Sequence, residues 1–135
     1  MKYILPLILP AILLLAACGE SHSHVTADDL EAAIKAGTVT VIDVNGTNSF
    51  NAGHIPGAID FEANADKLEG LLPEDKGAMI VAYCGGPMCP AYKDGLAAAE
   101  KLGYTNLQHY SGGISGWKKA GKELEKAEEA APATN

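Results

Sequence analysis

The sequence contains no arginine and few cationic residues of any kind. Ten lysines stand against 17 aspartates and glutamates, which gives a formal net charge of −7. Such an acidic chain is poorly suited to bind nucleic acid or an anionic membrane face. The chain also lacks the side chain that most often holds phosphate through two parallel hydrogen bonds. The composition therefore argues against nucleic acid as a partner and against a phosphate site.

Long apolar runs are scarce, and the longest lies at the N-terminus. Residues 4–15 are apolar, are interrupted by two prolines and follow Lys2. The run is short for a membrane span and is typical of a secretory signal. Leu-Ala-Ala-Cys at residues 15–18 resembles the lipobox of bacterial lipoproteins, whose cysteine is lipidated. We expect residues 1–17 to be a signal peptide, with an uncleaved anchor helix as the alternative, and Cys18 to be the lipidation site.

Lipidation of Cys18 would attach the protein to a membrane outside the cytoplasm. Several acyl chains on one residue hold a protein firmly at a membrane surface. Gly19 stands where inner-membrane retention signals usually carry Asp, so the resemblance favours the outer membrane, facing the periplasm. The membrane is thus an expected partner through the lipid and not through surface charge.

The mature chain has the length of a single domain. We expect residues 18–23 to be a lipidated polar tether and residues 24–121 to be the folded domain. Residues 122–135 are rich in Glu, Lys and Ala before a final Pro, and they predict a helical extension and a disordered tail. His22 and His24 have no third metal ligand close by, so a solvated linker is predicted there and no metal site.

Strand and helix patterns alternate between residues 24 and 121. Strands are predicted at 39–44, 59–61, 79–83 and 107–110, and helices at about 27–37, 49–52, 65–72, 91–102 and after 113. This alternation predicts an α/β domain with a parallel sheet covered on both faces. Ligands bind such sheets at the carboxyl ends of the strands. Asp43, Cys84 and the turn at 112–113 all lie at these ends.

Cys84 follows the apolar strand 79–83 directly. The loop after it is Gly85, Gly86, Pro87, Met88, Cys89 and Pro90, and a helix pattern then begins. At such a position backbone N–H groups and the helix dipole favour a thiolate. The placement predicts a nucleophile at Cys84, and an inert buried thiol is the alternative.

Four motifs in this order resemble the rhodanese-like (sulfurtransferase) family. They are Val41-Ile42-Asp43-Val44, Gly53-His54-Ile55-Pro56-Gly57-Ala58, Tyr83-Cys84, and Gly103-Tyr104 with Gly112-Gly113-Ile114-Ser115-Gly116-Trp117. The resemblance covers about residues 24–121. It implies a small three-layer α/β domain with a five-stranded, mostly parallel sheet.

The resemblance implies that Cys84 is a sulfur carrier. Its thiolate would take the outer sulfur of a small donor such as thiosulfate, a persulfide or a polysulfide. An acceptor thiol or cyanide would then take this sulfur from Cys84. The loop from Gly85 to Cys89 would stabilise the anionic sulfur through backbone N–H groups, without a cofactor or a metal.

The loop departs from the family in its lack of arginine. A common member has Arg near the position of Cys89, and the loop is also somewhat longer than usual. A longer loop could suggest the phosphatase branch of the fold, but that branch holds phosphate with a loop Arg, so phosphatase chemistry is not expected. Lys93 is the nearest cation, and we expect it on the solvated side of its helix.

Cys89 has two open interpretations. Five residues from Cys84 across a curved loop, it could resolve a persulfide on Cys84 or protect Cys84 as a reversible disulfide. Alternatively, it is a residue at a helix start with a partly buried thiol. The spacing alone does not fix the distance between the two cysteines.

The remaining matched residues are predicted to be structural. Asp43 is expected to accept hydrogen bonds near the loop, and His54 to be a hydrogen-bonded scaffold residue. Asn45 stands where the family often carries an Arg after the strand-end Asp, so an ion pair is missing. His109 is expected to border the pocket, and Trp117 to anchor the last helix in the core.

Three functions stay open. The first is a lipid-anchored, extracytoplasmic sulfurtransferase that carries sulfane sulfur on Cys84. The second is a thiol–disulfide redox protein using Cys84 and Cys89, although their spacing differs from the Cys-x-x-Cys of thioredoxins. The third is a binding module that keeps the fold without turnover, which the missing arginine favours.

Overall fold

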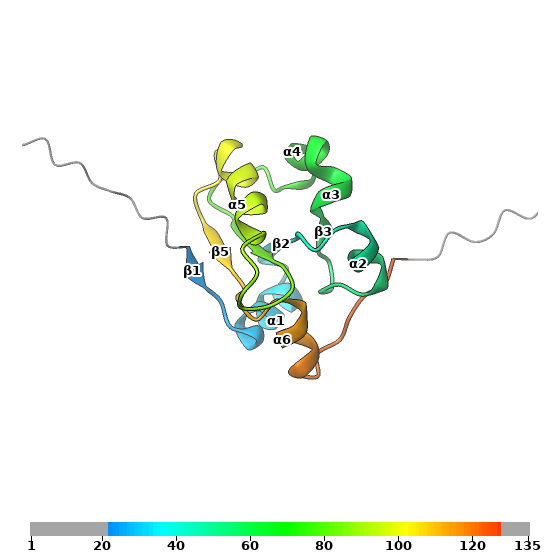
Figure 1. Ribbon diagram of the computed structural model, residues 1–135. Helices are drawn as coiled ribbons and strands as arrows, with labels where there is room; N and C mark the ends of the chain where they lie inside the picture. The colour runs from blue at the N-terminus through cyan, green and yellow to red at the C-terminus, as the bar shows by residue number, and fades with distance from the viewer. Residues whose placement is uncertain (1–21, 128–135) are drawn as a thin grey trace, which may run out of the picture.

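All five strands of the sheet are parallel, in the order β1-β5-β4-β2-β3. The computed structural model describes residues 22–127. The strands are β1 (Ser23–His24), β2 (Val39–Asp43), β3 (Ile59–Asp60), β4 (Met79–Tyr83) and β5 (Leu107–His109). The register pairs Asp43 with Tyr83 and Ala82 with His109, which brings the carboxyl ends of the central strands to one edge (Figure 1).

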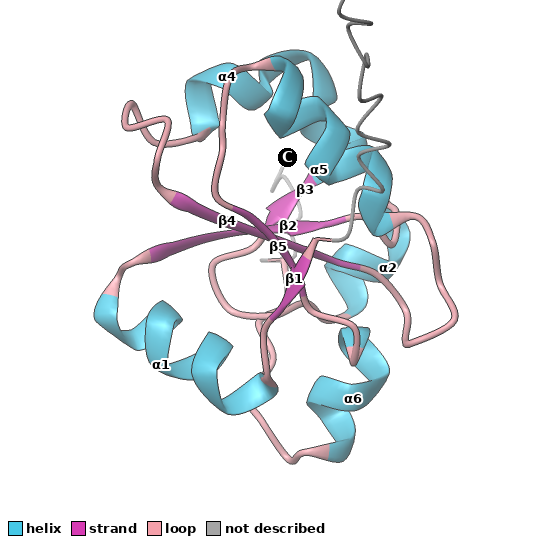
Figure 2. Cartoon of the chain, turned by 90° about the vertical axis from the view of Figure 1, so that its left-hand side faces the viewer, coloured by secondary structure: helices cyan, strands magenta, loops and turns pink. Residues whose placement is uncertain are grey.

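Helices cover both faces of the sheet and make three layers, as the sequence predicts (Figure 2). One face carries α1 (Ala27–Ala36) and α6 (Gly113–Lys119). The other carries α3 (Phe61–Asn64), the 3₁₀ turn η1 (Ala65–Lys67), α4 (Leu68–Leu71) and α5 (Tyr92–Lys101). The short α2 (Thr47–Ala52) lies between β2 and β3 in the chain. Among residues 22–127, no helix has the length and apolar character to cross a membrane.

The core is divided by the period-two alternation of β2 and β4. Ile42, Ile80 and Ala82 pack toward α4 and α5, together with Leu68, Leu72, Leu96, Ala99 and Tyr104. Val41, Val81 and Tyr83 pack toward α1 and α6, together with Leu30, Ile55, Tyr110 and Trp117. Trp117 is 1% exposed and anchors α6 in the core, which confirms its predicted role.

Local sequence explains where α1 begins and how α5 packs. Thr26 caps α1 by accepting a hydrogen bond from the Asp29 N–H at 3.1 Å, and Gly37 ends this helix at φ +70°. In α5, Gly95 faces β2 so closely that an added Cβ would lie 3.1 Å from Ile42 Cγ2. This glycine lets the helix that follows the Cys84 loop lie directly on the central strands.

The predicted tether contains a strand that the sequence pattern does not reveal. Ser23 and His24 form β1, which pairs with Gln108 and His109 of β5 at the sheet edge. The strand has two polar residues and therefore no apolar alternation to detect. Backbone pairing with β5 holds it, so the domain begins one residue earlier than predicted.

The helical extension predicted from Lys122 is wrong for the residues that the structure describes. Residues 122–127 are extended, and the main chain of Glu125 pairs with that of His54 through N–H···O distances of 2.8 and 2.9 Å. Leu124 packs against the α1 and α6 face of the core. Tertiary contacts thus override the helical propensity of the Glu/Lys/Ala composition. Residues 1–21, with Cys18, and residues 128–135 lie outside the described residues.

Candidate functional site

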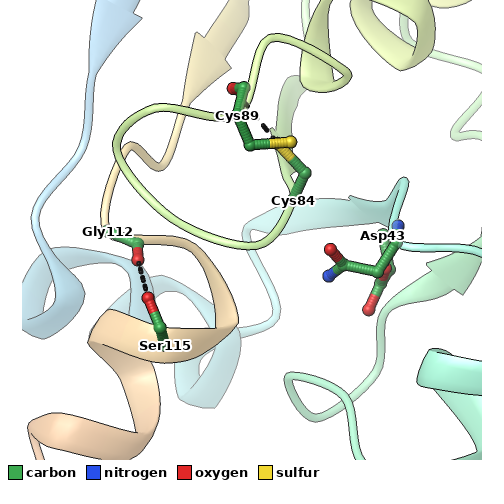
Figure 3. Close-up of a disulfide and its surroundings, with 6 residues drawn as sticks. Asp43, Cys84, Cys89, Gly112 and Ser115 are labelled. Carbon is green, nitrogen blue, oxygen red and sulfur yellow. Dashed lines mark hydrogen bonds between the residues drawn. A yellow bond between two sulfur atoms is a disulfide. The ribbon is translucent and has the colours of Figure 1, made fainter.

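Cys84 and Cys89 form a disulfide at the carboxyl end of β4 (Figure 3). Their Cα atoms are 6.2 Å apart, and the Cys84 sulfur lies 3.2 Å from the main-chain oxygen of Cys89. Cys84 is 1% exposed, whereas Cys89 is partly exposed. The sequence left open whether Cys84 and Cys89 form a disulfide, and in the structure they do. The disulfide must be reduced before Cys84 can act as a nucleophile.

The loop between the two cysteines turns tightly above β4. The Cys89 N–H donates to the Gly86 carbonyl at 3.1 Å, which closes a four-residue turn with Pro87 at its second position. Met88 extends from this turn and is 94% exposed. The loop thus presents its tip to solvent while Cys84 stays below the surface.

The first turn of α6 holds the other end of the loop. The N–H of Ile114 donates to the Cys84 carbonyl at 2.9 Å, and the N–H of Ser115 donates to the Gly85 carbonyl at 3.1 Å. The N–H and C=O of a trans peptide point in opposite directions. Since both carbonyls point toward α6, the N–H groups of Gly85 and Gly86 point away from it.

Gly113 makes this contact between α6 and the loop possible. Its φ is +60°, and an added Cβ would lie 2.5 Å from both the Cys84 carbonyl oxygen and the Gly86 nitrogen. A side chain there would displace the loop. The neighbouring Ser115 hydroxyl donates to the Gly112 carbonyl at 3.4 Å, as drawn in Figure 3. The Gly112–Gly113 turn of the sequence motif therefore allows α6 to pack closely against the cysteine loop.

Asp43 is buried at the carboxyl end of β2 and accepts hydrogen bonds, as expected. Tyr83 donates its hydroxyl to the Asp43 carboxylate, and the Asn45 N–H donates to Asp43 Oδ1 at 2.8 Å. The Tyr83 hydroxyl in turn accepts from the Ile55 N–H at 3.0 Å. Burial raises the pKa of Asp43, and these hydrogen bonds oppose that effect. Burial and the Asp43 charge raise the pKa of Tyr83, so the tyrosine remains a donor.

His54 is hydrogen-bonded within the fold, as expected. Its side chain is nearly buried, its Nδ1 lies 2.8 Å from the Phe50 carbonyl, and its ring stacks on that of Phe50 at 3.7 Å. Its Nε2 lies 3.4 Å from Glu125 Oε2. These contacts join α2 to the extended segment 122–127.

His109 is the last residue of β5 and is buried in the sheet. It is 3% exposed, and its ring stacks on Tyr92 of α5 at 3.3 Å between centroids. Neither ring nitrogen has a hydrogen-bond partner within residues 22–127. Burial and the nearby His24 and His22 lower the pKa of His109 to about 4. This residue is therefore a neutral core histidine at physiological pH.

A pocket of about 340 Å³ opens beside the cysteine loop. Its walls are Asn45, Ser49, Ala52, Gly53, Gly85, Ile114 and Lys118. Lys118 supplies a positive charge beside main-chain atoms of the loop, and Asn45 and Ser49 supply neutral polar groups. Lys93 instead lines a different pocket with His22, Asp94 and Glu100, on the solvated side of α5 as predicted. Across residues 22–127, no group of three or more His, Cys, Asp or Glu residues has the arrangement of a metal site.

The family model for the rhodanese-like domain matches residues 26–120. This chain belongs to the rhodanese-like family. The match covers most of the chain and agrees with the all-parallel five-stranded sheet, so the predicted family and fold are confirmed.

Relatives of this rhodanese-like protein differ in function. Thiosulfate sulfurtransferase GlpE of Shewanella oneidensis is 29% identical over 106 residues, which are 74% of this chain and 96% of that enzyme. HTH-type transcriptional regulator Rv0324 of Mycobacterium tuberculosis is 33% identical over 105 residues, which are 76% of this chain. This chain spans only 45% of the regulator's length.

A solved structure supports the fold of the rhodanese-like domain. SseA of Escherichia coli, described as a 3-mercaptopyruvate sulfotransferase with the rhodanese fold, superposes with a TM-score of 0.65. The two chains are 20% identical, and the match covers 79% of this chain and 52% of SseA. At this identity the likeness shows a shared architecture and does not transfer an activity.

Lys118 lines the pocket beside Gly85, and the sequence reasoning did not single it out. It follows the buried Trp117, and it lies four residues after Ile114, whose N–H binds the Cys84 carbonyl. Residues four apart share one face of a helix. This spacing was the available signal, because it places Lys118 on the face of α6 that meets the loop.

Proposed function

We propose that this protein is a sulfurtransferase that carries sulfane sulfur as a persulfide on Cys84. The observation that carries the proposal is the position of Cys84. It lies at the carboxyl end of β4, on a loop whose carbonyls are held by α6, so the N–H groups of Gly85 and Gly86 are turned away from that helix. Such N–H groups stabilise an anionic sulfur without a charged side chain. Family membership and the relation to GlpE support this assignment.

The first half-reaction requires the reduced protein. The Cys84 thiolate attacks the outer sulfur of thiosulfate and forms a new S–S bond. The original S–S bond of thiosulfate breaks, and its electron pair leaves with sulfite. In the second half-reaction a thiol or cyanide takes the outer sulfur and returns the electron pair to Cys84.

The pocket beside Gly85 is proposed as the donor-binding site. Its opening adjoins the loop, and Lys118 gives it a positive charge in an otherwise acidic protein. Thiosulfate is a dianion, so a cation close to the loop favours its approach. Lys118 therefore offers the charge that the loop lacks through its missing arginine.

The site of action is proposed to be a membrane surface outside the cytoplasm. The proposal rests on the lipobox-like residues 15–18 and on the persistence of disulfides in such compartments. The full chain should fractionate with membranes, and a Cys18→Ser variant should not. Equal membrane fractions for both proteins would overturn lipid attachment at Cys18.

A burst of sulfite tests the sulfurtransferase proposal. The reduced protein, freed of reductant and mixed with thiosulfate, should release one sulfite for each Cys84. Cys84→Ser should release none. A wild-type protein that releases no sulfite would contradict the proposal and favour a module without turnover.

Two other functions each have an observation in their favour. The relation to regulator Rv0324 is compatible with a non-catalytic module, although this chain covers less than half of that protein. The Cys84–Cys89 disulfide is compatible with a thiol–disulfide redox protein. Such a protein would exchange electrons with dithiols but would release no sulfite from thiosulfate.

A further inference from the structure

The Cys84–Cys89 disulfide shows that the two sulfur atoms meet within the folded loop. Their Cα atoms are 6.2 Å apart, a normal separation for a disulfide. The loop is fixed on both sides of this bond, by the hydrogen bonds from α6 to Cys84 and Gly85 and by the turn that joins Gly86 to Cys89. Cys89 can therefore reach the Cys84 sulfur without unfolding the loop.

We propose that Cys89 resolves the Cys84 persulfide and releases its outer sulfur as hydrosulfide. The inference rests on the proposed function, because it needs a persulfide on Cys84. The Cys89 thiolate attacks the inner sulfur, which is the original Sγ of Cys84. The Cys84–Cys89 disulfide forms, and the bond to the outer sulfur breaks. Its electron pair leaves with the outer sulfur, which takes up the proton that the Cys89 thiol lost on ionising and departs as HS⁻.

The resulting disulfide is the state in the structure, and a dithiol must reduce it before the next cycle. Cys84 is 1% exposed, whereas Cys89 is partly exposed and adjoins Met88, which is 94% exposed. An incoming dithiol therefore attacks Cys89 first. The Cys84 thiolate leaves, and the second thiol of the reductant then frees Cys89. Over a full cycle, thiosulfate and the dithiol yield sulfite, hydrosulfide and an oxidised dithiol.

This chemistry gives Cys89 a role distinct from that of a structural residue at a helix start. A structural Cys89 would leave the sulfur on Cys84 until an external acceptor arrived. A resolving Cys89 makes sulfide release intramolecular, and it consumes both protein thiols in the same step. The two outcomes differ in one turnover without added acceptor.

The test measures sulfite and sulfide together in a single turnover. Every sample is the full chain with Cys18→Ser, so that Cys84 and Cys89 are the only cysteines, and it is reduced and then freed of reductant. With thiosulfate, the protein with both cysteines should release one sulfite and one sulfide, and lose both free thiols. Cys89→Ser should release sulfite but no sulfide, and should keep one extra sulfur atom in its intact mass.

The outcomes separate this inference from the proposed function. Sulfite release with the sulfur retained on a protein that still has Cys89 would overturn resolution while leaving the sulfurtransferase standing. Equal sulfide release from Cys89→Ser would overturn it as well. If no protein releases sulfite, both proposals fail. Cys89→Ala serves as a second variant, and loss of both thiols in step with sulfide release supports resolution without any variant.

The order of the reducing step has its own readout. The oxidised protein treated briefly with a monothiol such as glutathione should form a mixed disulfide on Cys89. Peptide mass analysis locates the adduct. An adduct found on Cys84 would overturn the proposed direction of attack.

Discussion

At the scale of single residues, His109 carries an ionisable ring that is buried and has no hydrogen-bond partner within residues 22–127. Burial and the neighbouring His24 and His22 lower its pKa from 6.5 to about 4. Between these two values the unfolded chain binds more protons at this residue than the folded protein does. His109 therefore makes stability fall as the pH drops from 6.5 toward 4.

Replacing His109 with Phe should flatten this pH dependence. A phenyl ring keeps the stacking on Tyr92 and cannot bind a proton. Urea unfolding measured at several pH values between 4 and 7 should show a smaller loss of stability in His109→Phe than in the wild type. The exposed His24 contributes a smaller part of this effect than burial does, so His24→Gln should retain most of the wild-type slope. An unchanged slope in His109→Phe would contradict the low pKa.

Lys118 is the residue on which the proposed donor pocket depends. Lys118→Ala should raise the KM for thiosulfate roughly two- to fivefold, as expected for the loss of one exposed charge interaction. Lys119→Ala is the matched control, because Lys119 is exposed on the same helix and does not line the pocket. Steady-state kinetics with thiosulfate compare the two variants. Equal effects would mean that only the overall charge matters.

At the scale of elements, the site is formed where β4, the cysteine loop and the first turn of α6 pack together. Two hydrogen bonds hold the loop on α6, and the backbone of Gly113 packs directly against the backbone of the loop. The loop therefore owes its shape to a helix almost thirty residues further along the chain.

Gly113→Ala should disrupt the packing of the cysteine loop on α6. The added Cβ would meet the Cys84 oxygen and the Gly86 nitrogen at 2.5 Å, in a backbone conformation that already disfavours side chains. We expect a loss of about 2 kcal/mol or more in unfolding free energy, and a strong loss of sulfite release. Gly121→Ala is the control, because Gly121 has φ +71° and no atom within 4 Å of an added Cβ. Similar losses in both variants would mean that backbone strain alone is responsible.

The sequence predicts the elements whose patterns come from the core. The apolar run 79–83 matches β4 to the residue, because its side chains are buried or nearly so and turn residues bound it. The carboxyl ends of parallel strands lie at one edge of the sheet, and this also predicts that Asp43, Cys84 and Gly112–Gly113 lie at the same edge. By contrast, β1 and the segment 122–127 are held by backbone pairing with distant residues, which leaves no periodic signal.

The sequence could not decide the state of the two cysteines or find Lys118. The disulfide depends on how far the loop curves, and a five-residue spacing permits several curvatures. Lys118 becomes relevant only when α6 packs beside the loop. Both are consequences of tertiary packing and not of local pattern.

At the scale of the whole molecule, the last described residues pack back onto the first half of the domain. The extended residues 122–127 run back to His54, and Lys122 binds Asp28 and Glu31 of α1 at 2.8 Å each. The C-terminal end of the domain thus packs against α1, near its N-terminal end. Leu124 is the apolar member of this closing segment.

Leu124→Ala should measure how much this closure contributes. Leu124 is half-buried against the core, so we expect a loss of about 1–2 kcal/mol in unfolding free energy. Leu71→Ala is the matched control, because Leu71 is 47% exposed and should lose at most about 0.5 kcal/mol. Urea denaturation gives both values. A Leu124 effect no larger than the Leu71 effect would contradict a stabilising closure.

The central claim is that Cys84 carries the sulfur, and the most direct test is to find that sulfur by mass. The Cys89→Ser protein, reduced and treated with thiosulfate, should gain one sulfur atom, and peptide analysis should place it on Cys84. Cys84→Ser under the same conditions should gain none. An unchanged mass for Cys89→Ser, with its fold intact, would contradict the account.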